Sequence, residues 1–176
     1  MSPGLLYLLL SPPIVAVGLL KYRADYRRHQ HTTWLGLGAV TVAFLMPHMV
    51  LNYAFPMVVV PRSTIETVGM SIMALGLAGC LWPLRHFSKN MWTGMEQPHL
   101  VTSGPYRYSR NPQYVTYFFF LAGYAIMGRT ILAWVALVLY WIVTHLIVLI
   151  EEEHLERRFG DAYRTYKRDT PRYLFW

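Results

Sequence analysis

The sequence predicts an all-α integral membrane protein with about five transmembrane helices, a C-terminal helical hairpin and a polar cytoplasmic tail helix. Its 176 residues are 55% hydrophobic and only 14% charged, whereas a typical soluble domain carries about 25% charged residues. Apolar stretches of the length that a helix needs to cross a bilayer recur along the chain. The basic residues flank these stretches, so the net charge of +7 indicates contact with membrane lipids rather than with nucleic acid.

Five apolar stretches are candidates for these spans. The second is too long for one straight span and contains Pro47 and Pro56, so we expect it to tilt, kink or end in a short re-entrant piece. Only Gly128 and Arg129 separate the last two, which predicts a tight antiparallel hairpin. The predicted spans cover residues 3–20, 33–60, 63–84, 113–128 and 130–150 of a single membrane domain, 1–176.

The distribution of basic residues predicts how the spans are oriented. All but two of the 16 lysines and arginines fall in three segments: the first loop (21–28), the loop before the fourth span (85–110) and the tail (151–176). With five spans, these three segments lie on one side of the membrane, and only Arg62 and Arg129 lie on the other. Because basic residues concentrate in cytoplasmic loops, we expect that loop and the tail to be cytoplasmic.

The tail is predicted to form a polar helix from Glu151 to Arg168. Its apolar residues recur at spacings of three and four, which places them on one face, against the membrane surface or the protein body. Glu153 and Arg157 are spaced to form an i,i+4 ion pair. We expect Pro171 to lie beyond the end of this helix.

Two polar segments carry the residues that could do chemistry. One is the loop 98–114, rich in Tyr, Arg and turn-forming Gly-Pro and Asn-Pro pairs; the other begins with Glu151 and Glu152. Each alone also fits a simpler interpretation, as a membrane-surface connector with snorkelling arginines or as a solvated helix face. Because both flank the predicted hairpin, they should meet at its cytoplasmic end. A carboxylate facing tyrosines at the edge of hydrocarbon suits a small ligand with a cationic end and a lipid-dissolved partner.

The same segments resemble a known family. The residues that carry the resemblance are Leu100-Val101-Thr102-Ser103-Gly104-Pro105-Tyr106, Arg110-Asn111-Pro112-Gln113-Tyr114, and Glu151-Glu152 followed by Phe159-Gly160 and Tyr163. Together they resemble the C-terminal signature of the isoprenylcysteine carboxyl methyltransferases, which the phospholipid N-methyltransferases share, over about residues 98–171. The resemblance implies a helical membrane fold and S-adenosylmethionine as methyl donor, held in a cytoplasmic pocket under the loop and the tail. It also implies a lipophilic acceptor that enters from the bilayer.

The resemblance further implies which residues bind the donor. Tyr106 and Tyr114 would hold its adenosyl portion or face its sulfonium by cation–π attraction. Glu151 or Glu152 would bind its amino group or ribose hydroxyls, with Glu151 slightly favoured. Carried over by position, the expected cofactor-binding residues are His99, Leu100, Val101, Tyr106, Asn111, Pro112, Gln113, Tyr114, Glu151 and Glu152, and no metal ligand is expected.

The chain departs from the family pattern at three positions. Asn111 stands where the family usually has His, and His99 lies one residue closer to the Leu-Val pair than its counterpart does. Ile147 replaces an arginine that would meet the carboxylate of a prenylcysteine. Two other residues are candidates for a catalytic role. Arg110 could anchor the acceptor. His145 is an ionisable residue within a span and lies on the same helical face as Glu152.

Several alternatives stay open. The acceptor could be a carboxylate, an amine or a thiol on a lipid-soluble small molecule or a lipidated group. A membrane NADPH-dependent reductase of the sterol-reductase type, or a non-enzymatic membrane protein, would also fit a hairpin followed by a polar tail. The soluble alternative for this donor, a doubly wound sheet with a glycine-rich loop, has no matching pattern in the sequence. The oligomeric state is not predicted.

Overall fold

The computed structural model describes residues 3–42, 61–86 and 98–174, and within these ranges every regular element is helical. This confirms the all-α class for the described part of the chain. Two of its helices are long and apolar enough to cross a membrane by length and composition: α3 (Thr64–Leu81) and α6 (Ile131–Phe159). The count of five spans stays a prediction. Residues 34–42 of the second predicted span are helical, and 43–60 lie outside the described residues.

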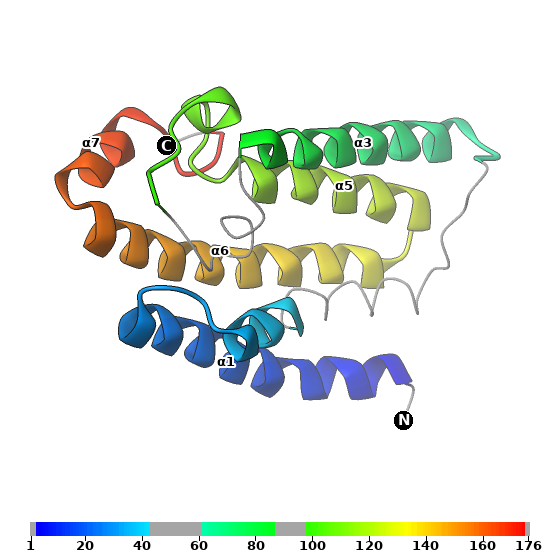
Figure 1. The fold of residues 1–176 in the computed structure, drawn as a ribbon. Helices are drawn as coiled ribbons and strands as arrows, with labels where there is room; N and C mark the ends of the chain where they lie inside the picture. The colour runs from blue at the N-terminus through cyan, green and yellow to red at the C-terminus, as the bar shows by residue number, and fades with distance from the viewer. Residues whose placement is uncertain (1–2, 43–60, 87–97, 175–176) are drawn as a thin grey trace.

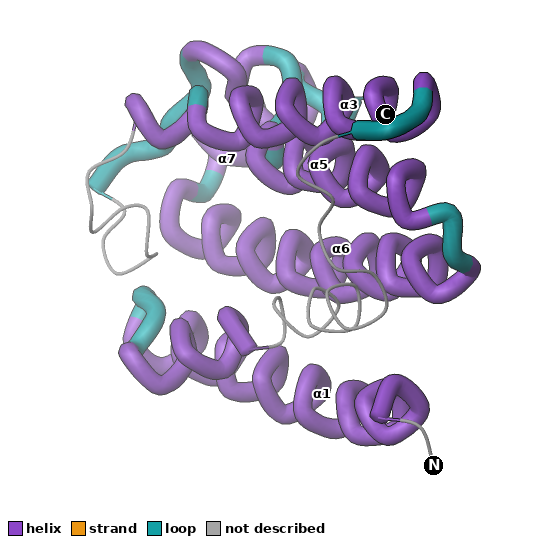
Figure 2. Tube along the Cα trace, turned by 90° about the vertical axis from the view of Figure 1, so that its right-hand side faces the viewer, coloured by secondary structure: helices purple, strands orange, loops and turns teal. Residues whose placement is uncertain are grey.

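The long helices lie side by side in the order α1, α6, α5, α3, as Figure 1 shows. Here α1 is Pro3–His29 and α5 is Pro112–Gly128. Two short 3-10 helices, η1 (Pro83–His86) and η2 (Gly104–Arg107), and the last helix, α7 (Asp161–Asp169), complete the described elements. The view turned by 90° in Figure 2 keeps the same order of long helices. The helix α7 lies at one end of this layer, near the segment that follows it (Figure 1).

The first helix extends further than the sequence predicts. We expected a span over residues 3–20 followed by a basic loop, but α1 continues to His29, so the basic residues of that predicted loop are helical. Pairs four residues apart support this extension, since Lys21 forms an ion pair with Asp25 and the hydroxyls of Tyr22 and Tyr26 lie 3.0 Å apart. The helix ends before Gln30, whose φ of 60° is left-handed.

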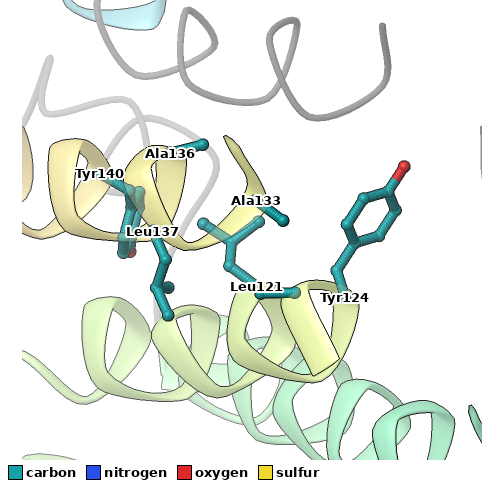
Figure 3. Close-up of a cluster of buried hydrophobic side chains, with 7 residues drawn as sticks. Leu121, Tyr124, Ala133, Ala136, Leu137 and Tyr140 are labelled. Atoms are coloured by element: carbon teal, nitrogen blue, oxygen red, sulfur yellow. The ribbon is translucent and has the colours of Figure 1, made fainter. Parts of the chain in front are cut away.

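The predicted hairpin is confirmed. The helix α5 ends at Gly128, Arg129 takes a left-handed conformation with a φ of 50°, and the Thr130 side chain caps α6 by accepting a hydrogen bond from the Ala133 amide. Side chains of α5 and α6 then meet in a buried cluster (Figure 3). Its members are Leu121, Tyr124, Ala125, Ala133, Ala136, Leu137 and Tyr140.

Glycines allow α3 and α5 to approach closely. A Cβ added at Gly76 would lie 2.7 Å from the carbonyl oxygen of Thr116, and one added at Gly123 would lie 2.6 Å from the amide nitrogen of Met73. Small residues at such contacts let membrane helices pack backbone against backbone. The hairpin is therefore held against α3, which fixes the direction in which α5 leaves the loop 98–114.

The tail is not the single helix that we predicted from Glu151 to Arg168. The helix α6 continues through Glu151 without a break and ends at Phe159, and Gly160, with a φ of 52°, separates it from α7. The polar residues from Glu151 onward do not interrupt the backbone hydrogen bonds of α6, so the helix continues through them. Gly160 ends it, because glycine adopts a positive φ at no steric cost. The predicted ion pair is present, with 2.6 Å between Arg157 Nη2 and Glu153 Oε1.

Candidate functional site

The polar end of the α5–α6 hairpin brings together the two segments that the sequence singled out. The Tyr114 hydroxyl, on the first turn of α5, donates a hydrogen bond of 2.9 Å to Glu151 on α6. Arg110, in the loop before α5, lies 3.3 Å from the carboxylate of Glu152. The expectation that the loop meets the carboxylates at one end of the hairpin therefore agrees with the geometry.

Glu151 accepts hydrogen bonds only from tyrosines among the described residues. The Tyr22 hydroxyl on α1 donates to the same oxygen, Oε1, at 2.9 Å, the distance found for Tyr114. Glu151 also lies close enough to the loop that its negative charge, after burial, raises the pKa of Tyr106 above its usual value. No described arginine or lysine forms an ion pair with Glu151. Among the described residues, the Glu151 carboxylate therefore has tyrosine hydroxyls as partners and no cation.

Glu152 has the opposite environment, because two arginines bind it. Arg172 Nε and Nη2 lie 3.0 and 2.8 Å from its two oxygens, and Arg110 Nη2 lies 3.3 Å from Oε1. The residue is 5% exposed. Buried carboxylates need such partners, since an unpaired buried charge is costly. The sequence left the choice between the two glutamates open; among the described residues, Glu152 has two arginine partners and Glu151 has none.

A short segment after α7, residues 170–174, joins the loop to α6. The carbonyl oxygen of Pro171 accepts a hydrogen bond of 2.9 Å from the Arg110 amide. The carbonyl oxygen of Arg172 accepts from Asn111 Nδ2 at 3.1 Å and from Ser109 Oγ at 3.2 Å. The Tyr173 hydroxyl lies 2.9 Å from Nδ1 of His145. We call residues 170–174 the closing segment, because they connect all of these groups.

Asn111 and His145 both contact this closing segment. Asn111 uses its side-chain amide to hold the carbonyl oxygen of Arg172. His145 and Glu152 contact Tyr173 and Arg172, two consecutive residues, which fits the prediction that both lie on one face of α6. Ile147, where the resembling family has an arginine, is 2% exposed and packs in the apolar contact between α1 and α6.

Aromatic residues of the loop and of α7 form a buried cluster over this site. The Tyr166 hydroxyl donates a hydrogen bond of 2.7 Å to the carbonyl oxygen of Tyr106, and Tyr163 is 1% exposed. Burial raises the pKa of Tyr163 and of Tyr166, so both hydroxyls stay protonated at neutral pH. The cluster of Tyr106, Tyr163 and Tyr166 is completed by Leu100, Val101, Leu155 and Phe159.

The remaining predicted residues are placed unevenly. Pro112 is the buried first residue of α5, and Gln113 is half-buried, with an Nε2 that has no hydrogen-bond partner in the described part of the chain. A buried amide donor without a partner could bind an oxygen of a ligand. His99 is exposed, so the structure does not bring it into the buried group.

Sequence reasoning missed Tyr22, Arg172 and Tyr173. Tyr22 belongs to α1, and no local pattern signals a contact 129 residues away in sequence. The one available hint was the spacing of Tyr22 and Tyr26, which places two amphipathic aromatic rings on one face where the helix becomes polar. Arg172 and Tyr173 follow Pro171, and we interpreted this stretch only as the basic end of the tail.

An apolar pocket of about 520 Å³ lies beside the site, between α5, α6 and the closing segment. Tyr173 both lines this pocket and contacts His145, so the pocket adjoins the polar groups. Pockets of this size bind small molecules or parts of lipids. Its lining consists of Val115, Phe118, Phe119, Leu137, Val138, Trp141, Tyr173 and Leu174.

Comparison with known proteins identifies the family of the chain. Residues 64–162 match the family model described as phospholipid methyltransferase. A curated relative, the nickel-cobalt-cadmium resistance protein NccN of Alcaligenes xylosoxydans xylosoxydans, is 32% identical over 108 residues, which is 61% of this chain and 48% of the relative. The chain thus spans about half the length of that relative. No solved structure matches the chain. Among the described residues, no group of three or more His, Cys, Asp or Glu could hold a metal ion.

Proposed function

The chain belongs to the phospholipid methyltransferase family of membrane methyltransferases, and on that premise we propose that it methylates a lipid-soluble acceptor with S-adenosylmethionine at the polar end of the α5–α6 hairpin. The observation that carries the proposal is the Glu151 carboxylate, which accepts hydrogen bonds from Tyr22 and Tyr114 and has no described cation as a partner. When bound, S-adenosylmethionine supplies a methyl group on a positively charged sulfur. We propose that this site faces the cytoplasm, where the donor is dissolved.

The residues present fit such a donor. Glu151 would hold its positive charge, and the rings of Tyr22, Tyr106 and Tyr114 would add cation–π attraction in a site with little water. The unpartnered Nε2 of Gln113 would donate a hydrogen bond to a ligand oxygen. The backbone of Leu100 and Val101, with Asn111 and Pro112, would line the rest of the donor site. His99 and Glu152 are the weaker members of the predicted set, since His99 is exposed and Glu152 already binds two arginines.

The acceptor would approach through the membrane. The pocket between α5 and α6 has an almost entirely apolar lining, to which Tyr173 belongs, so it suits the hydrocarbon part of the acceptor. The acceptor's nucleophile must reach the methyl group from the side opposite the departing sulfur, at roughly 3 Å. The chain's contribution would be to orient both molecules and to exclude water, which favours methyl transfer to an anionic acceptor.

His145 is proposed as a base only if the acceptor is an amine. A protonated amine must lose a proton before it can attack, whereas an ionised carboxylate or thiolate needs no base. His145 adjoins the apolar pocket through its contact with Tyr173. A labelled N-methylated amine as the product would support His145 as a base. A labelled methyl ester or thioether as the product would exclude that role.

The test is methyl transfer by the detergent-purified protein with labelled S-adenosylmethionine and a total lipid extract. The Glu151→Gln variant should bind the donor about 10- to 100-fold more weakly, because it loses one charge-assisted contact worth about 1.5–3 kcal/mol. Glu156→Gln is the matched control: the same chemical change on the same helix, at a residue that pairs with Arg164 and Lys167. If the wild-type protein does not bind S-adenosylmethionine, or if NADPH protects it instead, the proposal is wrong.

A further inference from the structure

The Arg110 guanidinium is buried and only partly used. Its side chain is 8% exposed, and Nη2 lies 3.3 Å from Glu152. The other two nitrogens, Nε and Nη1, are buried and have no hydrogen-bond partner in the described part of the chain. Buried charged donors almost always have acceptors, because water is no longer available to them. We therefore expect Nε and Nη1 to bind an acceptor that the described residues do not supply.

The charges around Arg110 favour an anion as that acceptor. Arg110 and Arg172 share the single negative charge of Glu152. Glu151 is the next residue, but consecutive residues lie about 100° apart around a helix, and its carboxylate is bound by Tyr22 and Tyr114 instead. The neighbouring tyrosines of α7 are neutral, as their raised pKa values require. Arg110 and Arg172 together thus carry one more positive charge than the Glu152 carboxylate neutralises.

We propose that Arg110 forms an oxyanion-binding subsite, which takes a carboxylate or a phosphate of a ligand. Guanidinium groups bind both oxyanions strongly, because several N–H donors and a fixed positive charge act together. Glu152 then serves as a positioning residue that holds the guanidinium in place. This inference rests on the proposed function and deepens it, because the oxyanion belongs either to the amino-acid end of the methyl donor or to the acceptor.

The subsite adjoins the closing segment. The Arg110 amide donates to the carbonyl oxygen of Pro171, and Arg172 binds the same carboxylate as Arg110. An oxyanion bound at Arg110 would satisfy its Nε and Nη1 beside these contacts.

Two arms of one binding experiment distinguish the sources of the oxyanion. The first compares S-adenosylmethionine with its decarboxylated analogue, and the second compares phosphatidic acid with diacylglycerol of the same chains in detergent micelles. In each arm we compare the wild-type protein with Arg110→Gln. Arg107→Gln is the matched control, because Arg107 lies exposed in η2 of the same loop.

We expect Arg110→Gln to weaken binding of the oxyanion-bearing ligand in one arm by about 10- to 100-fold, while binding of its counterpart without the oxyanion stays unchanged. If the single variant folds poorly, the Arg110→Gln/Glu152→Gln double variant replaces it, because it removes the Glu152 carboxylate together with its Arg110 partner. The double variant should show the same selectivity. Equal effects on both members of each pair, or no effect, would overturn the inference. If the wild-type protein does not bind S-adenosylmethionine at all, the proposed function is refuted instead.

Discussion

A methyl group added at Gly123 should separate α5 from α3 and destabilise the protein. The new Cβ would lie 2.6 Å from the amide nitrogen of Met73 and closer still to the carbonyl oxygen of Gly69. Ordinary contacts of this kind are about 3.5–4 Å. Both obstructing groups are backbone atoms of a helix, so no side chain can rotate away. The helices must therefore move apart by about 1 Å, which weakens the contacts along their shared face.

The size of the effect follows from two opposing contributions. Overpacking of a tight contact costs about 1–3 kcal/mol, and the backbone-to-backbone clash places Gly123→Ala toward the upper part of that range. Replacing a helical glycine by alanine contributes about 1 kcal/mol in the other direction. We therefore expect the free energy of unfolding to fall by about 1–2 kcal/mol.

Reversible unfolding in mild detergent, measured for Gly123→Ala beside Gly38→Ala, tests this reasoning. Gly38 lies in the helical residues 34–42, and a Cβ added there meets nothing within 4 Å. It should therefore show the gain from helix propensity without the clash. If Gly123→Ala is as stable as Gly38→Ala, the close approach of α3 and α5 does not determine the packing of the hairpin, and the argument is refuted.

Two further predictions concern the polar end. Tyr166→Phe removes the hydroxyl that donates to the carbonyl oxygen of Tyr106, so it should cost about 0.5–1.5 kcal/mol in unfolding free energy and weaken donor binding by loosening the loop; Thr165→Ala, at an exposed neighbour, should do neither. Burial acts to raise the pKa of Asp25, but the hydrogen bonds from Lys21 and Thr33 together lower this pKa below its ordinary value. A depressed pKa contributes stability that is present above the ordinary value of about 3.9 and is lost as the pH falls through the folded value. Asp25→Asn should therefore be less stable than wild type at pH 7, and that difference should shrink below about pH 4; a difference independent of pH would contradict this.

The sequence predicted the hairpin and its meeting with the loop because both depend on nearby residues. Gly128 and Arg129 interrupt an otherwise apolar stretch, and a hairpin brings its two flanking segments to the same end. The carboxylates and the loop then have to approach each other, as the contact of Tyr114 with Glu151 shows.

The contribution of α1 could not be predicted in the same way. The contact between Tyr22 and Glu151 depends on how α1 packs on α6, and helix packing is determined by shape across the whole interface rather than by a local pattern. The break at Gly160 was also missed, because apolar residues continue at helical spacing through Phe159 and Tyr163. Periodicity reports which face is buried, and it does not report a single residue with a positive φ.

One turn of α6 makes contact with four different parts of the molecule. Glu151 faces Tyr22 and Tyr114, Glu152 binds the arginines of the loop and the closing segment, Glu153 pairs with arginines of α1, and the His154 ring stacks on Tyr26 at 4.2 Å. Because each step turns by about 100°, a substitution in this turn alters one contact at a time. A one-residue insertion among the apolar residues before it would instead rotate all four together, and every carboxylate would face the partners meant for its neighbour. The length of α6 between the hairpin turn and Glu151 therefore sets the register of the whole site.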